Sequence, residues 1–83
     1  MKLEKQEYEI LYYISRGGRN SLERLEGMFD SKVVLRAIEK LSKLGLIKIS
    51  YRDNKIYGFM ETTKGDNLLI SEEYKDWYYE MGD

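Results

Sequence analysis

The sequence predicts one α+β domain in which three helices are followed by a two-stranded β-hairpin and an amphipathic last helix. Three observations predict this order: apolar residues have helical spacing before residue 45, strand spacing between residues 47 and 61, and helical spacing again afterwards. The 83 residues leave room for one small core and no second domain. We therefore predict a single domain over residues 1–83, with the core and hairpin in residues 1–65 and the C-terminal helix in residues 66–83.

The first two predicted helices are separated by glycine. The first runs from Lys2 to Arg16 and ends at Gly17-Gly18, because a glycine pair after a basic residue is a typical helix stop. The second follows Asn20, which lies three residues before Glu23 in a capping pattern, and Gly27 leaves its end open. The residues expected to face the core are Leu3, Tyr8, Ile10, Leu11 and Ile14 in the first helix and Leu22, Leu25 and Phe29 in the second.

A third helix is predicted from a cap at Asp30 or Ser31 to Leu44, with Gly45 as the left-handed residue that ends it. Only a very short turn joins it to the second helix. Its inward stripe consists of Val34, Ile38 and Leu41.

The hairpin is predicted from alternation along two short segments. Apolar residues alternate with polar ones between Ile47 and Arg52, and a second strand runs from Ile56 to Glu61. Between them, Asp53-Asn54 is a typical two-residue turn.

The last helix is predicted from a cap at Thr62 or Thr63 to Met81, a length of about 28 Å. Two arrangements stay open: a helix that projects and pairs two copies of the chain, or one that folds back to complete its own core. Ser71-Glu72-Glu73 also offers a place for a break. The apolar stripe of this helix, and our candidate dimer interface, consists of Ile70, Tyr74, Trp77, Tyr78 and Met81.

Charge is unevenly distributed along the chain. The net charge is −1, but residues 31–65 carry eight basic and three acidic residues, whereas residues 66–83 carry one and six. Phosphate binding depends on local charge, so an acidic tail does not exclude a basic centre from binding nucleic acid. The chain has no Cys and no His, which excludes thiol chemistry, disulfides and the commonest metal ligand.

The third helix carries the candidate site. Four cations lie within about 80° of one another on a helical wheel, opposite the inward stripe. Such a cationic helix suits the major groove of DNA, whereas the simpler alternative is a solvated face with Glu39 paired to Lys43. Val33 and Leu35 flank the stripe and either touch thymine methyl groups or pack against the second helix, and packing is favoured for Leu35. The stripe consists of Lys32, Arg36, Lys40 and Lys43.

Two further cations, Arg52 and Lys55, bracket the hairpin tip, where they can reach a phosphate or the minor groove. Basic residues at an exposed strand tip also protect against aggregation, which is the alternative explanation.

The run from Val34 to Ile47 resembles the recognition helix and following turn of winged helix-turn-helix regulators such as the MarR and PadR families. Glu61-Thr62-Thr63-Lys64-Gly65 resembles the step by which those proteins leave the hairpin, or wing, and begin the next helix. Gly27-Met28-Phe29 departs from the usual glycine position, and the N-terminal dimerisation helix of the MarR family is missing. The resemblance implies DNA contacts at Ser31, Lys32, Val33, Leu35, Arg36 and Lys40, and wing contacts at Arg52 and Lys55.

These observations predict a sequence-specific, homodimeric regulator that binds double-stranded DNA. The alternative is a winged-helix module that binds another protein within a larger complex. We predict no enzyme activity, cofactor or metal, because no nucleophile–base pair, metal cluster or phosphate loop is visible. No apolar run approaches the length of a membrane span, so we expect an intracellular, cytoplasmic protein, in the host cytoplasm if it is viral. The composition and resemblance suggest a thermophile and an archaeal or archaeal-virus source.

Overall fold

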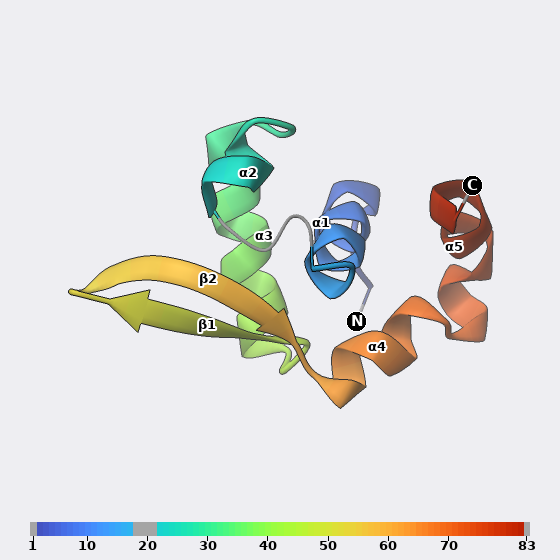
Figure 1. Ribbon diagram of the computed structural model, residues 1–83. Helices are drawn as coiled ribbons and strands as arrows, with labels where there is room; N and C mark the ends of the chain where they lie inside the picture. Colours follow the sequence, from blue (N-terminus) through green and yellow to red (C-terminus); the bar gives the residue numbers. More distant parts are fainter. Residues whose placement is uncertain (1, 18–21, 83) are drawn as a thin grey trace.

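The computed structural model describes residues 2–17 and 22–82. Figure 1 shows three helices, a hairpin and a C-terminal helical segment in chain order. This order confirms the predicted α+β class and is consistent with a winged helix-turn-helix topology. The elements are α1 (Lys5–Ser15), α2 (Leu22–Glu26), α3 (Ser31–Lys43), β1 (Ile47–Arg52), β2 (Lys55–Glu61), α4 (Thr63–Leu69), the 3-10 turn η1 (Glu72–Tyr74) and α5 (Lys75–Gly82).

Helix α1 is held at both ends by its own sequence. At its N-terminus Glu4 and Glu7 form a reciprocal capping box, in which the Glu7 side chain accepts a hydrogen bond from the Glu4 amide at 2.7 Å. The helix therefore begins at Lys5, three residues later than predicted. At the other end Gly17 has a φ of 76°, as expected for a helix stop.

Helices α2 and α3 form the predicted pair. Helix α2 has five residues, and Leu25 is its fully buried position; the cap predicted at Asn20 lies outside the described residues. The Asp30 side chain caps α3 by accepting a hydrogen bond from the Lys32 amide at 2.8 Å. Gly45, with a φ of 76°, follows the end of α3 and turns the chain into β1.

The hairpin is a two-stranded antiparallel sheet with a tight turn. Asp53 and Asn54 both have positive φ, 53° and 65°, as a type I′ turn requires. Along the strands, Ser50 pairs with Gly58 but Tyr51 pairs with Ile56, so one extra residue bulges from β2.

The core surrounds α1, which lies between α3 on one side and α5 on the other (Figure 1). Every helix and strand except α5 contributes at least one buried residue. Helix α5 contributes Trp77, Tyr78 and Met81, which are half-buried against the core. The fully buried side chains include Tyr8, Ile10, Leu11, Ile14, Leu25, Val34, Ile38, Leu41 and Leu46. No described helix has the length and apolar character needed to cross a membrane.

The start of α4 is tied closely to the end of α3. The Thr62 hydroxyl donates to the Gly45 carbonyl at 2.6 Å and accepts from the Gly65 amide at 3.1 Å. The Thr62 amide donates to the Leu46 carbonyl at 3.0 Å. These contacts fix the exit from the hairpin against the turn after α3, and they explain the Thr-Thr-Lys-Gly sequence at this point.

The predicted single C-terminal helix is wrong, because the chain breaks after α4 at the place where a break was considered. The amide and hydroxyl of Ser71 both bond to the Leu68 carbonyl, and the Tyr8 hydroxyl donates to the Leu69 carbonyl at 2.8 Å. Since these donors satisfy carbonyls at the end of α4, the helix ends there without glycine.

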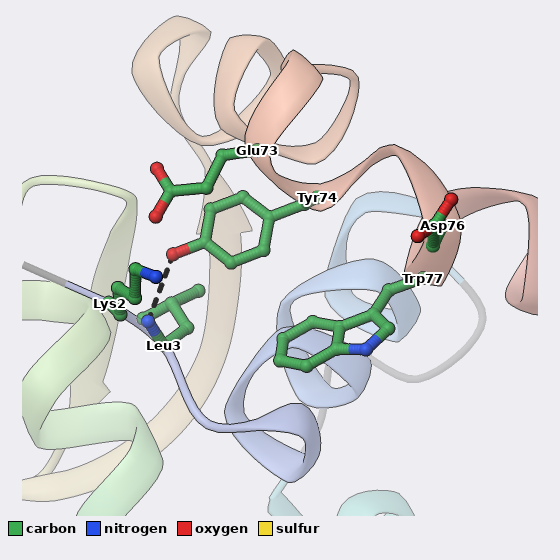
Figure 2. Close-up of a pocket in the computed structure, with 6 residues that line it drawn as sticks. All are labelled: Lys2, Leu3, Glu73, Tyr74, Asp76 and Trp77. Atoms are coloured by element: carbon green, nitrogen blue, oxygen red, sulfur yellow. Dashed lines mark hydrogen bonds between the residues drawn. The ribbon is translucent and has the colours of Figure 1, made fainter.

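After the break, the aromatic residues pack on α1. The Tyr74 ring stacks on Tyr8 at 5.4 Å between centroids, and Trp77 meets Tyr8 edge-on at 5.6 Å. In Figure 2 the Tyr74 hydroxyl accepts a hydrogen bond from the Leu3 amide at 2.9 Å, beside a shallow cleft that Trp77 also lines. The C-terminal segment therefore folds back on its own domain.

Candidate nucleic-acid interface

Helix α3 presents a charged face that no other element covers. Its opposite face is buried, because Val34, Ile38 and Leu41 pack in the core together with Ala37. Among the described residues, neither Lys32 nor Arg36 pairs with a carboxylate, and Lys43 meets only Glu39, at 3.1 Å between two exposed side chains. The exposed residues of α3 are Ser31, Lys32, Leu35, Arg36, Glu39 and Lys43. We call Lys32, Arg36 and Lys43 the basic face.

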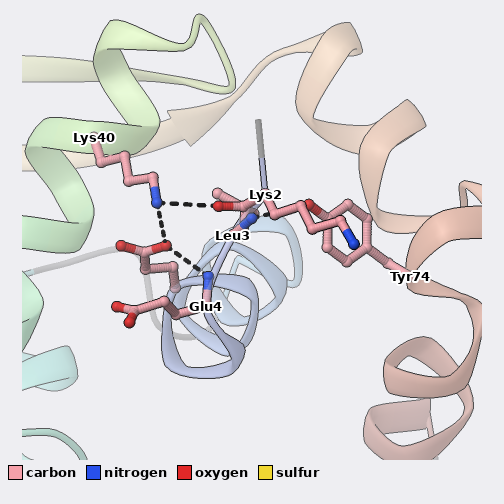
Figure 3. A network of polar contacts seen from close by, with 6 residues as sticks. Lys2, Leu3, Glu4, Lys40 and Tyr74 are labelled. Atoms are coloured by element: carbon pink, nitrogen blue, oxygen red, sulfur yellow. Dashed lines mark hydrogen bonds and ion pairs between the residues drawn. The ribbon is translucent and has the colours of Figure 1, made fainter.

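Lys40 differs from the other cations of the predicted stripe. Its ammonium donates to the Glu7 carboxylate at 2.8 Å and to the Lys2 carbonyl at 3.2 Å. Figure 3 shows Lys40 reaching across to Lys2. The hydrogen bond that Lys40 donates to Glu7 raises the pKa of Lys40 above its usual value. Lys40 thus joins α3 to α1 through Glu7 and to the chain before α1 through Lys2, instead of pointing freely outward with its neighbours.

Glu7 is the residue that the sequence interpretation missed. It is 9% exposed and receives hydrogen bonds from both Lys40 and the Glu4 amide. Glu4 and Glu7 have capping-box spacing, which was the available sequence signal for a structural role. That signal identifies the cap but gives no indication that Lys40 lies beside it.

The two apolar residues that flank the stripe differ in burial. Val33 is half-buried against the core, whereas Leu35 is 48% exposed. Leu35 lies on the side of α3 that faces the hairpin, and it lines a groove together with Ile49, Tyr51 and Ile56. The expectation that Leu35 packs against the second helix is therefore wrong.

This groove between α3 and the hairpin has a volume of about 480 Å³. The strands supply Ile49, Tyr51 and Ile56. On the opposite side α3 supplies Leu35, Ile38, Glu39, Ser42 and Lys43. Tyr51 is 65% exposed, so much of its ring is available at the surface. We call this feature the α3–hairpin groove.

The hairpin extends beside α3 and away from α4 and α5 (Figure 1). Arg52 and Lys55 are both exposed where the strands meet the turn, as predicted. The Arg52 guanidinium lies 5.5 Å from the centre of the Tyr57 ring, a cation–π contact across the hairpin. Lys48, exposed on β1, adds a cation that was not predicted to take part.

The other side of α3 is acidic. Glu4 and Glu7 lie beside Val33 and Arg36 around a small cleft of about 150 Å³. Glu7 is already paired with Lys40, so Glu4 is the carboxylate that disfavours phosphate on this flank, and the exposed cations of the hairpin favour an approach to α3 from the hairpin side.

Most of the predicted dimer interface lies within the monomer. Tyr74 is 5% exposed, and Trp77, Tyr78 and Met81 are half-buried against the core. Ile70, which is 67% exposed, is the one of the five whose side chain lies largely at the surface. Tyr79, which was not predicted, is 62% exposed on α5.

Among residues 2–17 and 22–82 no three carboxylates group closely enough to hold a metal ion. The comparisons add no relatives: no family model, no curated protein and no solved structure matches the chain. The resemblance to MarR and PadR regulators therefore stays a prediction. The observed order of helices and strands is consistent with the topology that this resemblance implies.

Proposed function

We propose that this protein is a sequence-specific, double-stranded DNA-binding regulator that acts as a homodimer. One observation carries the proposal: the basic face of α3 is exposed, its opposite side is anchored in the core, and the cationic hairpin lies beside it. A helix with its side chains is about 10–12 Å wide and fits a major groove about 12 Å wide. Helix α3 would enter the major groove while the hairpin contacts the adjacent backbone or minor groove.

The low net charge does not oppose this function. Of the acidic residues in positions 66–83, Asp66 lies on α4, next to the end of the hairpin, and the others that are described lie on η1 and α5. Helix α5 lies across α1 from α3 (Figure 1). Charges separated by more than about 10 Å are largely screened at physiological salt. The local surplus of cations on α3 and the hairpin therefore governs phosphate binding.

Each cation has a proposed role. Arg36 lies at the middle of α3, where a guanidinium can bind a guanine through two hydrogen bonds. Lys32, Lys43, Arg52 and Lys55 neutralise phosphates, and the hydroxyl of Ser31 at the start of α3 can bind a phosphate oxygen. Lys40 is assigned to holding α3 in place, because Glu7 already binds it.

The first test is fluorescence anisotropy of a labelled random-sequence duplex at about 50 and about 200 mM salt. We expect saturable binding that weakens steeply at the higher salt, because counterions released from the duplex drive association. Absence of binding at both salt concentrations would contradict the proposal and favour a protein-interaction module.

Two alanine variants separate the proposed roles. Arg36→Ala should weaken binding to a selected site by about 1–3 kcal/mol and relax the preference at one base pair, whereas Lys55→Ala should weaken all duplexes alike. Lys75→Ala, an exposed cation on α5, is the matched control and should leave binding unchanged. Equal losses on selected and random duplexes would show that Arg36 contacts only phosphate.

A further inference from the structure

We infer that Leu35 recognises the methyl group of thymine and that the α3–hairpin groove receives the DNA strand carrying it. This inference rests on the proposed function and deepens it, because it assigns a base preference to one apolar side chain. The structural basis is the position of Leu35, its exposure of 48% and the composition of the groove beside it.

A single exposed leucine has no special meaning on a protein surface. Leu35, however, continues an apolar lining formed by Ile49, Tyr51 and Ile56 across the groove. It also lies on the same exposed face of α3 as Lys32 and Arg36, the residues placed to meet DNA. A helix in the major groove would therefore carry this aliphatic side chain to the edges of the bases.

Charge complementarity identifies the occupant of the groove. Lys43 lies on its α3 side beside Glu39, with which it pairs, and the exposed cations Arg52 and Lys55 lie farther along the hairpin, so the apolar floor is bordered by more cations than carboxylates. A DNA strand matches this arrangement because its phosphates alternate with apolar deoxyribose rings. The acidic residues Glu4 and Glu7 lie on the other flank of α3, where Glu7 is paired with Lys40 and Glu4 disfavours phosphate, which favours the hairpin side for the strand.

The chemistry of leucine then limits what it can read. Its side chain has no hydrogen-bonding group, so it cannot distinguish the donor and acceptor patterns of the base pairs. Among the major-groove edges, only thymine presents a methyl group, and apolar contact with that group is an established form of direct readout. Tyr51, on the opposite side of the groove, would contact the sugar-phosphate backbone of the DNA, which is chemically the same in every sequence.

The experiment begins with selection of a preferred duplex from a random pool by the wild-type protein. The selected duplex is then made twice, once with thymine and once with deoxyuridine at every thymine position. The two duplexes have equal charge and equal hydrogen-bonding edges and differ only in the methyl groups. Affinities of wild type, Leu35→Ala and Tyr51→Ala are measured on both by fluorescence anisotropy, with circular dichroism to verify folding.

We expect the wild type to bind the thymine duplex about fourfold more tightly for each buried methyl group. Leu35→Ala should bind both duplexes equally while keeping its salt dependence. Tyr51→Ala should weaken both and keep the thymine preference, so it is the matched control within the same groove.

Three outcomes would overturn the inference. Equal, salt-sensitive binding of both duplexes by the wild type would remove the methyl contact and leave the proposed function standing. A thymine preference that survives in Leu35→Ala would assign the contact to another residue. Failure to bind any duplex would remove the inference together with the proposed function, and capture of acidic peptides by the groove would then be the next test.

Discussion

At the scale of single residues, Gly65 shows how closely the hairpin and α4 approach the turn after α3. A Cβ atom on Gly65 would lie 2.3 Å from the Leu46 carbonyl oxygen and 3.5 Å from a methyl group of Leu11. The first distance is far below van der Waals contact, and the oxygen belongs to the backbone, which cannot rotate aside. Position 65 therefore requires glycine for steric reasons, because the start of α4 packs directly on the backbone that follows α3.

We predict that Gly65→Ala lowers the free energy of unfolding by about 1–3 kcal/mol, since an added methyl group forces the packed backbone apart. Urea denaturation followed by circular dichroism would measure the change. Gly82→Ala is the control, because a Cβ atom there meets nothing within 4 Å. An unchanged midpoint for Gly65→Ala would show that α4 moves away without cost.

At the scale of secondary-structure elements, α1 connects the candidate DNA surface with the C-terminal segment. One side of α1 receives α3, and Glu7 holds Lys40 there. The other side receives η1 and α5 through Tyr8, whose ring stacks on Tyr74 and whose hydroxyl bonds to the Leu69 carbonyl. Any change in the C-terminal packing therefore reaches the helix that supports α3.

Tyr8 makes this packing sensitive to alkaline pH. Burial raises the pKa of Tyr8 from about 10 to about 12, so the folded state keeps the phenol proton where the unfolded chain releases it. The stabilisation is complete below pH 10 and is lost as the pH rises from about 10 to about 12.

We therefore expect the free energy of unfolding of the wild type to fall between about pH 10 and about pH 12, measured by urea denaturation. Tyr8→Phe should be less stable at neutral pH by about 1 kcal/mol, through loss of its hydrogen bond, but should lose less on alkalinisation. Tyr79→Phe, at an exposed position, serves as the control. The same alkaline loss in Tyr8→Phe as in the wild type would assign the effect to other groups.

The sequence was most informative where several local signals agreed. Helix α3 has a capping Asp30, an inward stripe and a terminal Gly45, and all three were found where predicted. The break after α4 was harder to predict, because Ile70 continues the apolar stripe and the donor to the Leu69 carbonyl is Tyr8, far away in the chain.

In the candidate site, too, local features were predicted and contacts between distant residues were not. A helical wheel gives the direction of a side chain from the axis of its own helix, but not which element lies in that direction. It therefore predicted the exposure of Lys32 and Arg36 and missed that Lys40 meets Glu7. For the same reason, it could not show that Leu35 faces the hairpin and not α2.

At the scale of the whole molecule, the fold is elongated, with principal extents of 39 × 23 × 21 Å. Helix α3 and the hairpin lie on one side of α1, and α5 lies on the other (Figure 1). Since Tyr74 is buried within the monomer, a homodimer must use surface that remains exposed, and Ile70 and Tyr79 are the apolar residues available on the C-terminal segment.

We predict that Ile70→Glu shifts the proposed homodimer toward monomer by about tenfold or more in dissociation constant, because a charge without a partner is costly in an apolar interface. Sedimentation velocity over a concentration series would measure the shift. Met60→Glu, with 62% exposure on the hairpin, provides a control of similar exposure. Two variants that both sediment as the wild type does would place the interface elsewhere, and a wild type that stays monomeric would contradict the proposed dimer.

The separation of charge along the molecule also affects how it would meet DNA. The cationic segment, residues 31–65, has a net charge of +5, and the following residues 66–83 have −5, so opposite charges are separated along the chain as a dipole despite its net charge of −1. In the field of a polyanion, such a dipole turns the cationic end forward before contact. A larger fraction of encounters would then begin in a productive orientation, and the association rate constant would fall as added salt screens this steering.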